Sequence, residues 1–150
     1  MKQFAFLNSQ GTVVYIVSPG NDDDYTDGQV YGEYTAREIA ADEDGPTFVK
    51  TKYYKNGWQT KPEKPGEYYN WVLSSESWEL DSARLFEGLR QLRTGKLVES
   101  DWTQIPDAPL TTEQKTAWQT YRQALRDIPA NNADITDLDQ VVWPTQPSQN

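Results

Sequence analysis

The side chains in this sequence with the most capacity for chemistry are its carboxylates. Aspartate and glutamate account for 23 of the 150 residues, whereas histidine and cysteine are absent. The chain therefore lacks an imidazole to exchange protons near neutral pH and a thiolate to act as a nucleophile. Hydrolysis by two carboxylates requires a pair at a defined separation, one of them with a raised pKa, and no pair stands out from the acidic background. We expect the protein not to be an enzyme.

The densest group of carboxylates lies in a predicted loop over residues 21–28. Calcium prefers oxygen ligands of this kind. An EF-hand frame that begins at Asp23 places tyrosines at the third and twelfth loop positions, where oxygen ligands are needed. We therefore expect a solvated acidic loop without a metal ion or a cofactor, and calcium binding between Asn21 and Gly28 is left open. The aspartates concerned are Asp22, Asp23, Asp24 and Asp27.

The charge balance of the chain bears on its partners. The formal net charge is -9, from 14 basic and 23 acidic residues, and residues 1–49 alone hold two basic and nine acidic side chains. Affinity for nucleic acid rests on clustered Lys and Arg, so we expect no nucleic-acid partner. The apolar run Val13–Val17 is far shorter than the ~20 residues that span a bilayer, and the N-terminus does not resemble a signal peptide. We expect a soluble protein with no membrane partner.

Residues 47–80 are rich in aromatic side chains interspersed with turn formers. Flat rings can stack on sugars, so this segment could form a carbohydrate-binding adhesion module. The competing interpretation, which we favour, is that a small sheet with few aliphatic residues uses its rings as a core, since each buries roughly 150–250 Å². The rings are Phe48, Tyr53, Tyr54, Trp58, Tyr68, Tyr69, Trp71 and Trp78.

The N-terminal residues indicate short antiparallel strands. Lys2–Leu7 and Thr12–Ser18 are rich in β-formers around a glycine-containing turn, which predicts a hairpin. Thr35–Ala41 is predicted to form one or two helical turns, broken by residues 42–46. Thr47–Tyr54 alternates like a strand and is followed by a turn with positive φ at Lys55-Asn56-Gly57. Lys61–Pro65 is expected to be stiff and extended.

Two amphipathic helices are predicted after residue 80. The first begins at a cap on Asp81 or Ser82, presents Leu85, Leu89 and Leu92 on one stripe, and kinks or ends at Thr94-Gly95. The second begins at a capping box formed by Thr111 and Gln114. It presents Trp118, Tyr121, Leu125 and Ile128 on one face and stops at Pro129. We thus predict an α+β protein, with a small antiparallel β region over 1–80 and a helical module over 81–150.

The C-terminal module also carries motifs in a distinctive order. Ser100-Asp101-Trp102-Thr103-Gln104 precedes a Trp-bearing helix that ends in Arg126-Asp127-Ile128-Pro129, and Trp143-Pro144 closes the module. This arrangement resembles the bacteriophage tail assembly chaperone family over residues 81–150. The shorter stretch Tyr54–Pro62 resembles segments of phage tail-fibre accessory proteins.

The resemblance implies a protein that binds another phage tail, baseplate or tail-fibre protein. It would act as an assembly chaperone in the host cytoplasm or remain as a minor component of the virion tail, and its oligomeric state, including a homo-oligomer, is left open. Rings on three separated segments would pack together, with Arg122 and Arg126 facing Asp101, Asp107 or a partner's carboxylates. A purely structural role for the rings is the alternative. The expected partner-binding residues are Asp101, Trp102, Asp107, Trp118, Tyr121, Arg122, Arg126 and Trp143.

Overall fold

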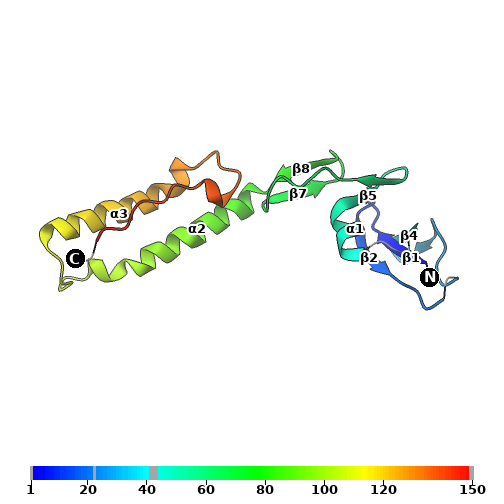
Figure 1. Cartoon of the computed structure of the whole chain (residues 1–150), viewed down its shortest axis with the longest axis horizontal. Coiled ribbons are helices and arrows are strands. Elements are labelled where there is room, and N and C mark those ends of the chain that lie inside the picture. Colours follow the sequence, from blue (N-terminus) through cyan, green and yellow to red (C-terminus); the bar gives the residue numbers. More distant parts are fainter. Residues whose placement is uncertain (1, 22, 41–43, 149–150) are drawn as a thin grey trace. The chain divides into compact units, whose positions relative to one another are not determined.

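The computed structural model of the chain describes residues 2–21, 23–40 and 44–148. They form two compact units (Figure 1). The N-terminal unit comprises Met1–Pro65 and Trp71–Glu79, and the C-terminal unit comprises Gly66–Asn70 and Leu80–Asn150. Antiparallel strands dominate the first unit and helices the second, so the predicted α+β class is confirmed.

A four-stranded antiparallel sheet organises the N-terminal unit. Its order is β2-β1-β4-β3, from β1 (Gln3–Leu7), β2 (Val13–Val17), β3 (Val30–Tyr31) and β4 (Tyr34–Ile39). The predicted β1–β2 hairpin is confirmed, and Gly11 in its turn has a φ of 79°. Val14 has no partner on β1, because Phe6 pairs with Tyr15 and Leu7 with Val13. This β-bulge interrupts the edge strand β2.

Strand β1 is buried on both faces of this sheet. Ala5 and Leu7 pack with Phe48 on one face. Phe4 and Phe6 pack with Ala36 on the other face, where tyrosines cover them. Burial on both sides explains why β1 is a nearly unbroken apolar run.

The helix predicted over Thr35–Ala41 is wrong, because this segment forms β4. Each residue from Thr35 to Ile39 pairs with one of β1, and Ala36 and Ile39 are buried. The pairing with an apolar central strand outweighs the modest helix propensity of the segment. The predicted end at Ala41 and the residues Asp42 and Glu43 lie outside the described residues.

The strand predicted over Thr47–Tyr54 is wrong in its first part, which belongs to α1 (Gly45–Thr51). The Asp44 carboxylate caps this helix by accepting a 3.0 Å bond from the Thr47 N–H. Pro46 occupies the first turn, where a missing N–H costs nothing. Asp44-Gly45-Pro46 therefore starts a helix, whereas we expected these residues only to end the preceding one.

Two small antiparallel sheets follow α1. The first pairs β5 (Lys52–Tyr54) with β6 (Trp58–Thr60). Asn56 and Gly57 between them have φ values of 54° and 124°, which confirms the predicted turn. The second sheet pairs β7 (Tyr69–Val72) with β8 (Ser77–Leu80). Lys61–Pro65 lies outside helices and strands.

The C-terminal unit is built on two helices, α2 (Ser82–Glu99) and α3 (Thr112–Asn131), which run side by side in opposite directions (Figure 1). Their predicted starts are confirmed. The Asp81 carboxylate accepts a 2.9 Å bond from the Arg84 N–H, and Thr111 and Gln114 form a reciprocal capping box. Two short 3-10 helices, η1 (Asp101–Gln104) and η2 (Leu138–Gln140), complete the unit.

Three predicted details of the helices are wrong. Helix α2 continues through Thr94-Gly95 to Glu99, where Ser100 caps it. Leu92 is half exposed, so the buried stripe contains Leu85 and Leu89 without it. Helix α3 continues past Pro129 to Asn131. A proline at this position removes one intrahelical bond, the one to the Leu125 carbonyl. The helix end leaves further carbonyls without intrahelical partners, and the Asn132 side chain donates to one of these, the Ile128 carbonyl.

Apolar side chains from the helices and the C-terminal segment form the core of this unit. Leu89, Ile128 and Val141 make one buried cluster, and Trp118, Tyr121 and Leu125 make a second. The whole face predicted for α3 is therefore buried. In the C-terminal segment Val141 is buried in this core, whereas Val142 is 84% exposed.

The two glycines inside α2 form a matched pair for a stability test. A Cβ on Gly95 would meet no atom within 4 Å, so Gly95→Ala should stabilise the unit by up to about 1 kcal/mol through helix propensity. A Cβ on Gly88 would lie 3.3 Å from both the Tyr68 hydroxyl and a Leu138 methyl. We expect this crowding to cancel or reverse the gain for Gly88→Ala. Urea unfolding measures both variants, and equal stabilisation would contradict the close packing of Tyr68.

Candidate partner-binding surface

Three of the aromatic side chains expected at the binding surface form a continuous ring cluster. The Trp118 ring meets the rings of Trp102 and Tyr121 edge to face, at centroid distances of 5.8 and 5.6 Å. Trp143 packs against the same cluster from the C-terminal segment, with the Lys96 ammonium 5.1 Å from its ring centroid. Segments far apart in sequence are thus held together as expected.

Burial separates the members of this ring cluster. Trp118 is completely buried and Tyr121 is 7% exposed, so these two rings serve the core and offer no accessible face to a partner. Trp102 and Trp143 are half-buried. Only these two can contribute both to the core and to an outer surface.

The turn after α2 is closed by side chains of the Ser100–Gln104 motif. The Ser100 hydroxyl donates to the Leu97 carbonyl at 2.9 Å, and the Thr103 hydroxyl donates to the Ser100 carbonyl at 2.7 Å. Each of these carbonyls thereby accepts a side-chain bond in addition to a 3.1 Å bond from a backbone N–H, that of Ser100 to Leu97 and that of Thr103 to Ser100. Ser100 and Thr103 are buried, so the motif is a structural device that ends α2 and begins η1.

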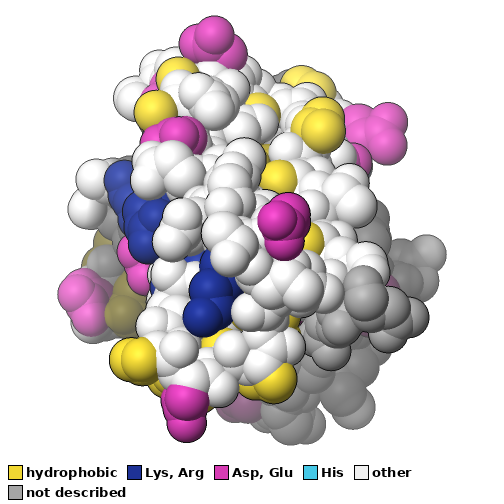
Figure 2. Space-filling view, turned by 90° about the vertical axis from the view of Figure 1, so that its left-hand side faces the viewer, with side chains coloured by type: hydrophobic (Ala, Val, Ile, Leu, Met, Phe, Trp, Pro, Cys, Tyr) yellow, Lys and Arg dark blue, Asp and Glu magenta, His cyan; other side chains and the backbone are white. Residues whose placement is uncertain are grey.

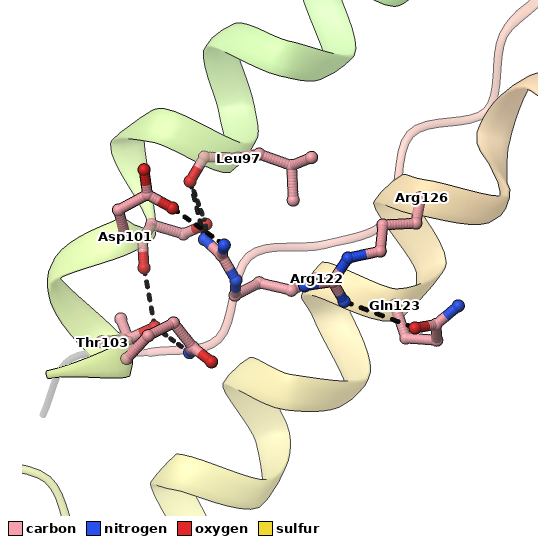
Figure 3. Close-up of polar contacts among 8 residues, drawn as sticks. Leu97, Asp101, Thr103, Arg122, Gln123 and Arg126 are labelled. Atoms are coloured by element: carbon pink, nitrogen blue, oxygen red, sulfur yellow. Dashed lines mark hydrogen bonds and ion pairs between the residues drawn. The ribbon is translucent and has the colours of Figure 1, made fainter. Parts of the chain in front are cut away.

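Arg122 on α3 ties this turn to the second helix (Figure 3). One guanidinium nitrogen, Nη1, donates to the Leu97 carbonyl at 2.7 Å and to the Ser100 hydroxyl at 2.6 Å. The other, Nη2, pairs with an Asp101 carboxylate oxygen at 2.8 Å. A cation here also complements the negative end of the α2 dipole.

The expected pairing of Arg122 with Asp101 is confirmed. The Arg122 side chain is buried under the turn, so it offers little accessible surface to a partner. Arg122 lies four residues after Trp118 and so shares the core-facing side of α3. The four-residue spacing between Trp118 and Arg122 was the signal in the sequence from which the burial of Arg122 could have been predicted. Arg126, by contrast, is exposed and donates to Gln123 on its own helix (Figure 3). Asp107 is also exposed, so it and Arg126 are accessible to a partner.

The turn presents exposed apolar side chains that the sequence did not single out. Val98 is 62% exposed and Ile105 is 50% exposed, and they flank η1 on either side. The Asp101 side chain between them is 60% exposed even though one oxygen is bound to Arg122. We call Val98, Asp101 and Ile105 the η1 surface. Figure 2 views the end of the unit at which α2 ends, where hydrophobic side chains are distributed among polar ones.

Comparison with known proteins bears directly on this unit. Residues 86–148 match the model of the family described as phage tail assembly chaperone protein. The family predicted for the C-terminal module is confirmed. The matched range contains the ring cluster, the Ser100–Gln104 motif and Arg122. No curated protein and no solved structure matches the chain.

Within the chaperone-family match, two pKa values are perturbed. Burial, and secondarily the charge of Glu99, raises the pKa of the Tyr121 hydroxyl, which agrees with a ring held in the core. The pKa of the exposed Glu113 carboxyl is lowered by hydrogen bonds from its own backbone N–H and from the Thr111 side chain. Neither group has the environment of a catalytic acid or base, because one is a neutral core phenol and the other a helix-start carboxylate.

In the N-terminal unit, some carboxylates of the acidic loop over residues 21–28 are bound by neighbouring groups of the same unit. Asp27 accepts a 2.9 Å bond from the Glu38 N–H and pairs with Arg37 at 3.3 Å. Asp24 accepts from the Asn21 N–H, and Asp22 lies outside the described residues. In the part of the chain that the structure describes, no group of three or more His, Cys, Asp or Glu is placed to hold a metal ion.

The aromatic side chains of residues 47–80 mostly pack on one another. Trp58 meets Phe48 and Tyr54 edge to face, and its indole N–H donates to the Glu38 carbonyl at 3.1 Å. Trp71 lies between Tyr53 and Trp78, with centroids 5.0 and 5.3 Å away. These contacts agree with the interpretation of the rings as core. Among the described residues, no helix has the length and apolar character to cross a membrane.

The two arginines one turn apart on α3 should respond differently to substitution. Arg122→Met removes the charged donor to Leu97, Ser100 and Asp101, and we expect a loss of about 2–3 kcal/mol in unfolding free energy. Arg126→Met, at an exposed position, should change it by less than about 0.5 kcal/mol. Chemical denaturation of the full chain gives both values. Equal effects of the two substitutions would contradict the structural role of Arg122.

Proposed function

We propose that this protein acts in bacteriophage tail assembly by binding another tail, baseplate or tail-fibre protein through its C-terminal unit, without catalysing a reaction. The observation that carries the proposal is the chaperone-family match, which covers the helical unit almost completely. The exposed apolar side chains of the η1 surface support it, since they are available on a unit that has its own buried core.

Binding by this surface follows from simple physical terms. Val98 and Ile105 would bury apolar area against a partner at roughly 25 cal/mol per Å². Unassembled tail components expose apolar faces and strand edges that promote aggregation, and a partner that covers them prevents it. Asp101 and Arg126 would contribute only about 0–1 kcal/mol each, so they would select orientation more than they would drive binding.

The place of action that fits this role is the host cytoplasm during assembly. A permanent place in the virion tail is the competing version of the same proposal. Mass spectrometry of purified virions separates the two. Presence at a fixed copy number relative to the tail tube would exclude the transient chaperone, and complete absence would exclude the structural component.

A pull-down from phage-infected cells tests the η1 surface. We expect Val98→Asp combined with Ile105→Asp to lower the amount of captured tail protein by about tenfold, as for a central apolar contact worth about 1.4 kcal/mol. Circular dichroism and the Tm should stay close to native, because Val98 is 62% exposed, Ile105 is 50% exposed and neither belongs to the buried core. The matched control is Val30→Asp, a valine of the N-terminal unit with the same 62% exposure as Val98.

Two results would count against this surface. Undiminished capture by the double variant would show that the partner binds elsewhere on the chain. An equal loss with Val30→Asp would show a general effect of added charge instead of a contact at η1.

A further inference from the structure

A groove in the N-terminal unit combines lysines with tryptophans. It has a volume of about 610 Å³, and it lies outside the chaperone-family match. Its lining comes from the end of α1, the segment Lys61–Lys64 and the second small sheet. The side chains used below are Lys50, Lys61, Glu63, Lys64, Trp71 and Trp78.

Two of the three lysines that line this groove lie over tryptophan rings. The Lys61 ammonium lies 5.9 Å from the centroid of Trp71, and the Lys64 ammonium lies 5.7 Å from that of Trp78. The Trp78 indole N–H donates to the Pro62 carbonyl at 2.8 Å, which fixes the extended segment beside the ring. Cations held in this way are ordered before any ligand arrives, so less side-chain entropy is lost on binding.

Lys61 lacks a compensating carboxylate. Its ammonium donates to the Val49 carbonyl at 2.9 Å, at the end of α1, and among the described residues it forms no ion pair. Partial burial lowers the pKa of Lys61, which is the response of a cation that loses water without gaining an anion. A bound carboxylate would reverse that penalty.

The charge of the groove is opposite to that of the whole chain. Three lysines and one glutamate line it, whereas the chain has a formal net charge of -9. One ammonium group lies near each tryptophan ring, so the groove combines cations with apolar ring surface. These features favour an extended ligand that carries both carboxylates and apolar side chains.

We propose that this groove binds an acidic, apolar-rich peptide segment of a protein partner, with its carboxylates on Lys50 and Lys61 and its apolar side chains against Trp71 and Trp78. The inference is independent of the η1 surface, because the two sites lie in different units and rest on different observations. It gives the N-terminal unit a binding role of its own.

Fluorescence anisotropy with the full chain tests the proposal. The probe is a short fluorescein-labelled peptide of alternating Asp and Leu, and the reference peptide has Asn in place of Asp. We expect the Asp peptide to bind and the Asn peptide to bind at least about tenfold more weakly, with affinity falling as salt increases. Binding should also raise the pKa of Lys61, which NMR of its ammonium group follows.

Matched variants locate the site. Lys50→Met combined with Lys61→Met should weaken binding of the Asp peptide by about tenfold or more. Lys52→Met, which removes one positive charge from a β5 lysine outside the groove lining, should leave it within about twofold. Lys50→Glu alone provides a second test if loss of the Lys61–Val49 bond disturbs folding, since Lys50 is exposed.

Each contrary outcome overturns the proposal. Equal binding of the Asp and Asn peptides, or equal loss with Lys52→Met, would rule out carboxylate recognition in the groove. A signal on a neutral glycan array that the Lys50 and Lys61 variants abolish, with no peptide binding, would assign the groove to sugars. Self-association of the purified chain that these variants abolish would assign it to a second copy. Failure of the η1 pull-down would affect none of these results.

Discussion

The guanidinium of Arg122 holds the end of α2, the start of η1 and the middle of α3 in one arrangement. At the end of α2 the Leu97 carbonyl accepts bonds from the Ser100 N–H, the Ser100 hydroxyl and the Arg122 guanidinium. Because the guanidinium is flat and carries several donors, it can do this while also binding Asp101. The exposure of Val98 and Ile105 depends on the same turn, so a buried charge determines what the unit presents outside.

Within residues 86–148 the ring cluster and the Arg122 contacts have different structural roles: the rings supply buried apolar area, and Arg122 fixes the turn after α2. Trp118 supplies buried area at the centre, and Trp102 and Trp143 bring η1 and the C-terminal segment onto it. Hydrogen bonds fix the turn where apolar packing alone would allow alternative arrangements. The Ser100–Gln104 motif is therefore mainly a structural device, and the partner contacts that we propose involve its neighbours Val98 and Ile105.

Local sequence patterns, such as helix caps, predicted much of the helical unit. Most of the features that they did not predict depend on contacts between residues far apart in the sequence. The capping residues Asp81 and Thr111 act within one turn, so their patterns gave the helix starts. Thr35–Ile39 has no strong preference of its own, and only its pairing with β1 makes it a strand. Asp44-Gly45-Pro46 did carry a helix-start signal, but the same residues also form turns. The burial of Arg122 was not predicted, because its acceptors, the Leu97 carbonyl and the Ser100 hydroxyl, lie 25 and 22 residues away in the sequence.

The unpaired Val14 has a consequence for the behaviour of the N-terminal unit at high concentration. Strand β2 is an apolar sheet edge without a charged residue, the kind of edge on which strands of other molecules add. The bulge puts an extra residue into that edge and shifts its outward N–H and C=O groups out of step with a regular strand. An incoming strand would lose bonds at Val14, so the irregularity that bends this edge also limits open-ended growth of the sheet from one copy to the next.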